Sequence, residues 1–404
     1  MPNMTPDKRE RKNITIFLMF TVALGIAGNI CSGGYTTTYL IKLGFDIEGI
    51  RNCGIIEQTV SIFAYLIFTR LPAVKKGLKN IYAATVLLAG MSPVVYIAAA
   101  YIPSFTVIYI IILSLTALNT ILGSFKTVAE FSMLPHLFPR SLYGTVTGKA
   151  MVAGGVISIG ISVGVDFLLK NDASSGYTFR FAVSALISAV SAFLVLLYKL
   201  DGGGNDTPPP CIAYSDIIKK IVSARYIKIM LPHFLRGVAV AGIYYIIPVS
   251  LENINLSNNE KSYLIIISVV STITGSFLFM RLNNKIKSGM ITFVSIFACS
   301  VIMPLVVICI NKYIFFILLF VFGIFNIVSS TSIPNGVLRS TTDDELPVIT
   351  SIRFVLMSVV SALFIFIFGI LLKYIAPVYI MLFSGIIFII CGFLYKKQFD
   401  DRFL

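Results

Sequence analysis

The sequence predicts an all-α integral membrane protein with twelve transmembrane helices and both termini in the cytoplasm. Its 404 residues are 57% hydrophobic and 12% charged, which is about half the charged fraction of a soluble domain, and the mean hydropathy is +0.91. Several apolar runs exceed the roughly 18 residues that cross the hydrocarbon core as a helix. These runs are apolar all round and lack the alternation of a barrel strand, so helices are favoured over a membrane barrel.

The expected spans follow one another between short polar breaks, and each is a run of mainly apolar residues. We place the twelve spans at residues 14–40, 50–69, 80–101, 105–129, 145–168, 178–199, 227–250, 262–280, 288–310, 313–334, 347–373 and 377–395.

A Gly/Pro-rich stretch, DGGGNDTPPP at 201–210, separates the first six spans from the last six, because such a composition cannot continue a helix. The segment after it has Ser215 as an N-cap and an apolar face, which predicts a short amphipathic helix on the cytoplasmic surface. We therefore expect a six-helix bundle at 1–200, a linker at 201–224 and a second six-helix bundle at 225–404.

The basic residues are distributed unequally between the two sides of the expected spans. The side that holds both termini carries a roughly threefold excess of Lys and Arg, which places it in the cytoplasm. The net charge of +14 is explained by this topology and by lipid headgroups, so the lipid bilayer is the expected partner and nucleic acid is not. We expect a multi-pass protein of the cell membrane.

The sequence lacks the motifs that are typical of several other classes of protein. The six cysteines show no CxxC or Cys/His ligand spacing, so we interpret them as packing residues and expect neither a metal site nor a cofactor. The sequence has no acid pair or nucleophile–base set for an intramembrane enzyme, and no phosphate-binding loop for an ATP-driven pump. We expect a protein that is not an enzyme.

The two sets of six spans resemble each other. FTRLPAVKKG follows the second span and FMRLNNKIKSG follows the eighth, so Arg70 and Arg281 occupy matching places. Aligning the segments after the fourth and tenth spans makes Lys149 and Arg353 equivalent. Repeated halves with a site at their interface near the membrane midplane are typical of transporters.

With these features the sequence resembles the major facilitator superfamily over nearly its whole length. The loop TRLPAVKKGLK keeps the bases of the family's loop after span two but lacks its aspartate, and span five has Gly154, Gly155, Gly160 and Gly164 without the antiporter proline. SMLPHLFPRS is similar to the sugar:cation symporters, whose acid pair in span two is here a single Glu57. The resemblance implies two bundles that rock around a central cavity lined by spans one, four, seven and ten.

Arg236 lies about nine residues into span seven, roughly 13 Å deep and near the midplane. A charge at that depth is costly, so we expect it either to bind an anionic group of the substrate or a mobile carboxylate, or to form a structural ion pair. His233 precedes it by one turn and is a candidate for coupling; the alternative is an interfacial histidine without a function.

Glu57 is the acid that lies well inside the early spans of the first half. We expect it either to carry a coupling proton or to be a fixed counter-charge for Arg236 or for a nearby base. Asp166, near the outer end of span five, is expected to form a gate salt bridge with Arg180.

Lys126 and Glu130 are four residues apart at the cytoplasmic end of span four, where they can pair. With the repeat-matched Lys149 and Arg353 they form an expected inward-side network that opens and closes with the halves. Alternatively, Lys126 contacts the substrate.

Uncharged polar residues gather on the spans that the resemblance assigns to the cavity. Such side chains either bind a polar substrate or hold helices together. The candidates for substrate binding are Asn29, Tyr35, Asn119, Tyr244 and Asn326.

The excess of bases over acids within the spans favours secondary transport of a small anionic or zwitterionic organic solute, coupled to a proton or sodium gradient. The alternative is a polyspecific drug exporter or a lipid flippase of the same fold, since aromatic residues are abundant. We expect the protein to act as a monomer.

Overall fold

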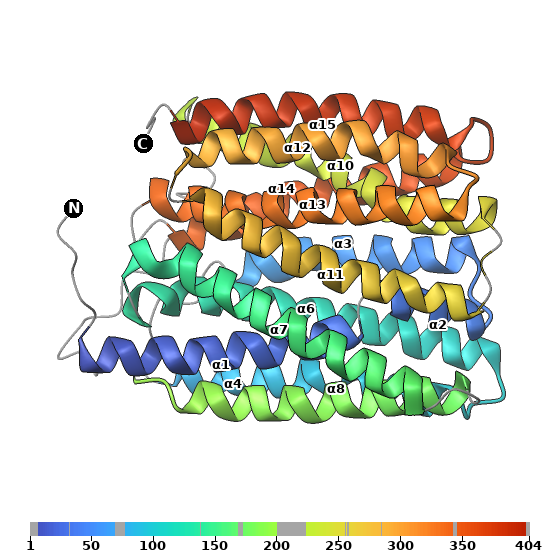
Figure 1. The fold of residues 1–404 in the computed structure, drawn as a ribbon, viewed down its shortest axis with the longest axis horizontal. Coiled ribbons are helices and arrows are strands. Elements are labelled where there is room, and N and C mark those ends of the chain that lie inside the picture. The colour runs from blue at the N-terminus through green and yellow to red at the C-terminus, as the bar shows by residue number, and fades with distance from the viewer. Residues whose placement is uncertain are drawn as a thin grey trace.

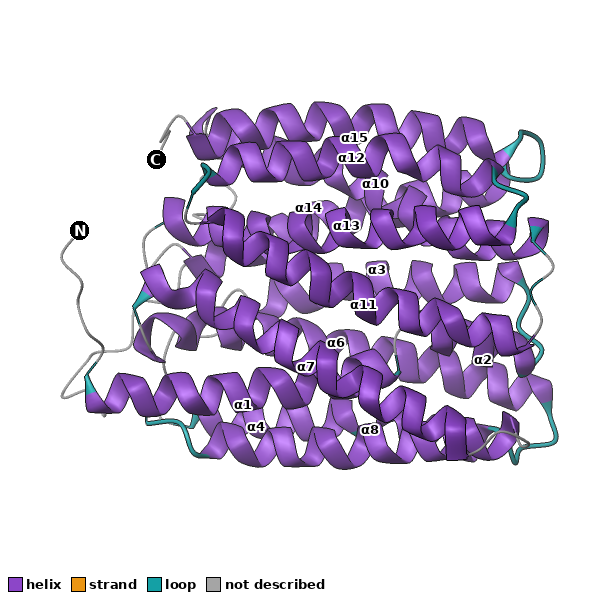
Figure 2. Ribbon diagram, viewed as in Figure 1, coloured by secondary structure: helices purple, strands orange, loops and turns teal. Residues whose placement is uncertain are grey.

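The computed structural model of this chain describes residues 7–31, 33–68, 77–137, 139–168, 173–199, 224–254, 256, 258–283, 285–341 and 346–400. Within these residues every regular element is an α-helix (Figure 2). The described residues contain ten segments that are long and apolar enough to cross a membrane. The fold is therefore all-helical, as the sequence predicts.

Eight helices account for the first six expected spans. They are α1 (Lys8–Ile30), α2 (Gly33–Lys42), α3 (Ile47–Phe68), α4 (Leu78–Gly90), α5 (Ser92–Ala99), α6 (Phe105–Leu137), α7 (Arg140–Leu168) and α8 (Ala173–Leu196).

Two of these expected spans are interrupted. The first is divided into α1 and α2, and α2 begins with Gly33 and Gly34, which have low helix propensity. The third is divided at Met91, because Pro93 lies in the first turn of α5 and lacks the N–H that would continue the hydrogen-bonding pattern of α4.

Each of the last six expected spans is one helix. They are α10 (Ala224–Asn253), α11 (Asn258–Asn283), α12 (Ser288–Ile308), α13 (Lys312–Ser340), α14 (Leu346–Leu371) and α15 (Pro377–Asp400). The linker helix expected at 201–224 lies almost entirely outside the described residues.

The helices pack side by side, and both described ends of the chain lie on the same side of the bundle (Figure 1). The packing of the first set recurs in the second. α1 packs on α7 and α8 as α10 packs on α14 and α15, and α4 packs on α6 and α8 as α12 packs on α13 and α15. The repeat in the sequence is therefore also a repeat in the packing.

Two helix pairs form most of the contact between the sets: α3 with α14, and α7 with α11. Small residues allow the second pair to approach closely. A Cβ atom on Gly155 would lie 2.3 Å from Cγ1 of Ile273, and one on Gly148 would lie 2.3 Å from Cγ of Met280. Larger side chains here would push α7 away from α11, which is why glycine suits these positions.

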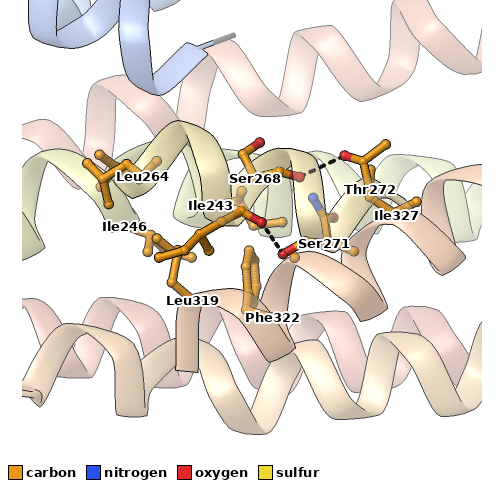
Figure 3. A pocket seen from close by; sticks show the side chains of 13 residues that line it. Ile243, Ile246, Leu264, Ser268, Ser271, Thr272, Leu319, Phe322 and Ile327 are labelled. Carbon is orange, nitrogen blue, oxygen red and sulfur yellow. Dashed lines mark hydrogen bonds between the residues drawn. The ribbon is translucent and has the colours of Figure 1, made fainter. Parts of the chain in front are cut away.

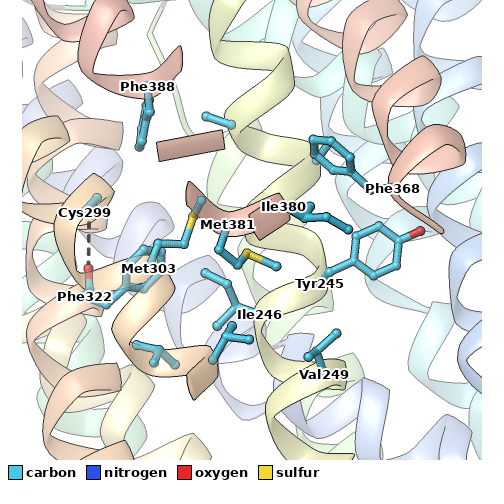
Figure 4. Packing of buried hydrophobic residues seen from close by; sticks show 14 of the residues in the cluster. Tyr245, Ile246, Val249, Cys299, Met303, Phe322, Phe368, Ile380, Met381 and Phe388 are labelled. Atoms are coloured by element: carbon cyan, nitrogen blue, oxygen red, sulfur yellow. Dashed lines mark hydrogen bonds between the residues drawn. The ribbon is translucent and has the colours of Figure 1, made fainter. Parts of the chain in front are cut away.

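An apolar core within the second set holds α10, α12, α13 and α15 together (Figure 4). Tyr245, Met303 and Met381 are fully buried in it. The phenol of Tyr245 donates a hydrogen bond to the carbonyl oxygen of Ile365 at 2.7 Å, so burial leaves no unmet donor there. This core gives the polar side chains of α10 a rigid support.

Candidate functional site

A polar cluster lies inside the second set of helices, around Arg236 of α10. His233 is buried, and its Nδ1 lies 2.6 Å from the phenol oxygen of Tyr395 on α15. Tyr395 also interacts with Arg236, which in turn lies within electrostatic range of Cys299 and Cys391. Arg236 is therefore surrounded by α12 and α15.

No carboxylate of the described part of the chain lies within ion-pair distance of Arg236. The partners that surround it are a phenol, an imidazole and two thiols. Arg236 is partly buried. A partly buried cation with neutral neighbours attracts an anion more strongly than a cation in bulk water does, because the local dielectric is lower.

Arg353 of α14 connects this cluster to the first set of helices. Its guanidinium carbon lies 5.7 Å from the ring centroid of Phe131 on α6 and 4.7 Å from that of Phe354. It is buried and within electrostatic range of His233 and Tyr395. A residue predicted for gating thus lies where the two sets of helices meet.

Glu57 of α3 has an exposed side chain, although it belongs to the middle of a packed helix. It lies within electrostatic range of Cys53 on the same helix, Tyr96 on α5 and Tyr244 on α10. These neighbours come from both sets of helices, so the carboxyl group faces accessible space inside the bundle. The structure does not pair Glu57 with Arg236 among the residues that it describes.

Lys126 and Glu130 lie on α6 within the first set. Both are partly buried and within electrostatic range of each other, as their spacing predicts. Glu130 also interacts with Tyr82 of α4 and lies near the buried Tyr198. This cluster is separate from the one around Arg236.

The remaining predicted residues have varied surroundings. Asn119 of α6 has a buried Oδ1 without a hydrogen-bond partner among the described residues, so it can accept a bond from a ligand or a water. Lys149 is exposed, unlike its repeat mate Arg353. The side chains of Asn29, Tyr35 and Asp166 lie outside the described residues.

Contacts between the two sets occur toward both ends of α3. At its outer end, the phenol of Tyr244 donates to the carbonyl oxygen of Ile50 at 2.6 Å. Toward its other end, the hydroxyl oxygens of Ser61 and Ser358 lie 2.6 Å apart, and the rings of Tyr65 and Phe354 stack at 4.8 Å. The two sets of helices therefore contact each other on both sides of Glu57 along α3.

An ion pair that no pattern in the sequence indicates also joins the sets at the outer surface. Nζ of Lys373, just after α14, lies 2.7 Å from Oε1 of Glu48 at the start of α3. The two residues are 325 positions apart, so neither spacing nor repeat matching indicated the pair. Lys373 and the nearby Arg51 hold the pKa of Glu48 below its ordinary value, the hydrogen bond from Lys373 being the main cause.

Acid on the outer face is expected to loosen this contact. Because the pKa of Glu48 is lowered, the pair contributes fully above the ordinary pKa of about 4.3 and is lost as the pH falls through the lowered value. Spin labels at Tyr101→Cys and Tyr374→Cys, both on exposed outer residues, should show a broader distance distribution near pH 3 and in Lys373→Gln. The side chains of Glu48 and Lys373 are about half exposed. Loss of their ion pair should therefore change the population of the conformation that is closed at the outer side by at most about fivefold.

The control is Glu260→Gln, which removes the ion pair of Glu260 with Lys312 inside the second set. That change should leave the distances between Tyr101→Cys and Tyr374→Cys as they are at neutral pH. An unaltered distribution in Lys373→Gln would contradict a role for this pair in closing the outer side.

A cavity of about 210 Å³ lies between α10, α11 and α13 (Figure 3). Eight large apolar side chains, one glycine and four uncharged polar residues line it, and the polar ones are Ser268, Ser271, Thr272 and Asn326. Asn326, predicted to bind substrate, is therefore at a cavity wall. Arg236 is not among the lining residues.

No protein-family model and no curated protein matches this sequence, but solved structures do. A variant of the E. coli fucose:proton symporter FucP matches with a TM-score of 0.67 and 12% identity, over 96% of this chain and 98% of that chain. FucP in its outward conformation matches with a TM-score of 0.66 and 12% identity, over 96% and 99%.

The human organic anion transporter MFSD10 (TETRAN) matches with a TM-score of 0.66 and 10% identity, over 96% of this chain and 100% of that chain. At such identities the likeness concerns the fold, and it extends over nearly the whole chain. It agrees with the repeated packing of the helices and with the order of the expected spans. This chain has the fold of the major facilitator superfamily, with twelve transmembrane helices in two pseudo-symmetric six-helix bundles.

Proposed function

We propose that this protein is a secondary active transporter that moves a small anionic or zwitterionic organic solute by alternating access. The observation that supports this most is the packing between the two bundles, which relies on the pairs α3 with α14 and α7 with α11. Helices paired in this way can rock against each other while each bundle keeps its own core. We take residues 1–200 and 225–404 as the two moving bodies, joined by the linker 201–224.

The charge of the solute is inferred from Arg236 and its surroundings. Arg236 is held by neutral partners, and Arg353 lies near the same His233. Two guanidinium groups near the same imidazole favour an anionic group of the solute. One structural neighbour is named as an organic anion transporter, which agrees with this choice.

Coupling is assigned to Glu57, with His233 as the second candidate. Glu57 lies in accessible space between the bundles, close to Tyr244, where a carboxyl group can take up and release a proton as the bundles rock. A proton is also the coupling ion named for FucP, while sodium remains the alternative. Asn119, Tyr244 and Lys126 are proposed as further contacts for the solute, whereas Asn326 lines a cavity to which Arg236 does not contribute.

We further propose that the protein works as a monomer in the cell membrane. The test is uptake by proteoliposomes that contain the purified protein, with a panel of anionic, zwitterionic and neutral solutes. Uptake of an anionic or zwitterionic solute should depend on an imposed proton or sodium gradient. Uptake of neutral solutes alone, or uptake indifferent to both gradients, would contradict the assignment.

A further inference from the structure

The cavity between α10, α11 and α13 is a feature of one bundle only. All of its lining residues belong to these three helices of the second bundle. α10 packs mainly on α14 and α15, whereas α11 packs mainly on α13 and on α7 of the first bundle. The cavity therefore lies within the second bundle, and none of its lining residues comes from the first bundle.

Close contacts between α11 and α13 form the walls of the cavity. At its wall, α11 and α13 approach so closely that a Cβ atom on Gly323 would lie 2.6 Å from Oγ of Ser271. Near its outer end, the ion pair of Glu260 with Lys312 and the edge-to-face rings of Tyr263 and Phe316 join the same two helices. The cavity is thus bounded by side-chain contacts on two sides.

The lining determines which chemistry can enter. None of the residues that line the cavity is charged, so an ion placed there would lose its hydration without gaining a counter-charge. The eight large apolar side chains favour an apolar body, because burying such a body releases water and restores dispersion contacts.

The polar side chains of the cavity determine where a ligand can form hydrogen bonds. The hydroxyl of Ser271 bonds the carbonyl oxygens of Ile267 at 2.6 Å and Phe320 at 3.1 Å, and that of Thr272 donates to the carbonyl oxygen of Ser268 at 2.9 Å. The side-chain amide of Asn326 has no such partner within the described part of the chain. Its two N–H groups and its carbonyl oxygen are free to bond a ligand.

We propose that this cavity is a binding site for an uncharged amphiphile, with an apolar body between α10, α11 and α13 and a hydrogen-bonding end at Asn326. The site is separate from the charged groups assigned to transport. Arg236 lies seven residues before Ile243, the nearest lining residue of α10, which is about 10 Å along the helix. The proposal therefore goes beyond the proposed function and does not depend on it.

The test uses 1-aminoanthracene, a neutral fluorescent amine, and anthracene-1-carboxylate, its anionic counterpart. Binding to the full-length protein in nanodiscs is measured by fluorescence, with empty nanodiscs subtracted. The neutral probe should bind saturably and at least tenfold more tightly than the carboxylate. Equal affinities, or tighter binding of the carboxylate, would overturn the proposal, and this comparison needs no variant.

Matched variants locate the probe. Leu319→Trp fills the cavity from α13 and should weaken binding of 1-aminoanthracene at least tenfold, whereas Ile317→Trp, at an exposed residue of the same helix, should not. Asn326→Leu should weaken binding by about tenfold, and Arg236→Ala should leave it unchanged. Undiminished binding to both Leu319→Trp and Asn326→Leu, or loss of binding in Arg236→Ala, would place the probe elsewhere.

Discussion

A disulfide between residues 61 and 358 is expected to abolish transport. The hydroxyl oxygens of Ser61 on α3 and Ser358 on α14 lie 2.6 Å apart, so the double variant Ser61→Cys/Ser358→Cys brings two thiols within reach of a disulfide. The bond would tie the two bundles together at one of their main contacts. Uptake by proteoliposomes should fall at least tenfold on oxidation and return on reduction.

The control is a crosslink that stays inside one bundle. The hydroxyl oxygens of Thr292 on α12 and Ser332 on α13 lie 2.8 Å apart, and both helices belong to the second bundle. Thr292→Cys/Ser332→Cys should therefore keep its uptake when oxidised. Both pairs are made in a background without the six native cysteines. Full uptake by protein that is completely crosslinked between residues 61 and 358 would contradict rocking of the two bundles.

Most of the fold could be predicted because lipid imposes simple rules on sequence. A spanning helix needs a long apolar run, and its flanking charges report the side on which they lie, so each expected span corresponds to observed helices. Some details escaped these rules, among them the division of the third span at Met91. The division of the first span before Gly33, and the continuation of α6 to Leu137, depend on local helix propensity and packing, which hydropathy does not measure.

The candidate site was harder to predict, because hydropathy does not indicate which way a polar side chain faces. The sequence identified Arg236 and His233, but their partner Tyr395 comes from α15, far along the chain. One signal could have found it: Leu-Tyr-Lys occurs at both 197–199 and 394–396. Each tyrosine lies beside an ionisable group of its own bundle, Tyr198 near Glu130 and Tyr395 near Arg236.

Repeat matching also had a limit. Lys149 and Arg353 align in the sequence, yet Lys149 is exposed whereas Arg353 is buried against Phe131 and Phe354. Residues matched by the repeat occupy the same position on corresponding helices of the two bundles, but the side chains that surround them differ. The contact between Glu48 and Lys373 has the same cause, since it exists only where the two bundles meet.

Replacing Arg236 by Ala is expected to reduce uptake at least 100-fold. Arg236 is the cation that lies among Tyr395, His233 and two cysteine thiols without a described carboxylate partner, so removing it removes the charge proposed to attract the anionic solute. Arg236→Lys should retain part of the uptake, since it keeps the charge but not the planar fork of donors. The measurement is initial uptake rate in proteoliposomes with equal amounts of inserted protein.

Arg281→Ala is the matched control, because Arg281 is an exposed arginine of the same bundle whose guanidinium carbon lies 4.5 Å from the ring centroid of Phe277. Its loss should change uptake by less than about twofold, as expected for an exposed cation–π contact. Thermal unfolding of both variants separates loss of binding from loss of the fold. If Arg236→Ala stays folded and transports at the rate of the unaltered protein, then Arg236 is a structural cation and the anionic character assigned to the solute loses its support.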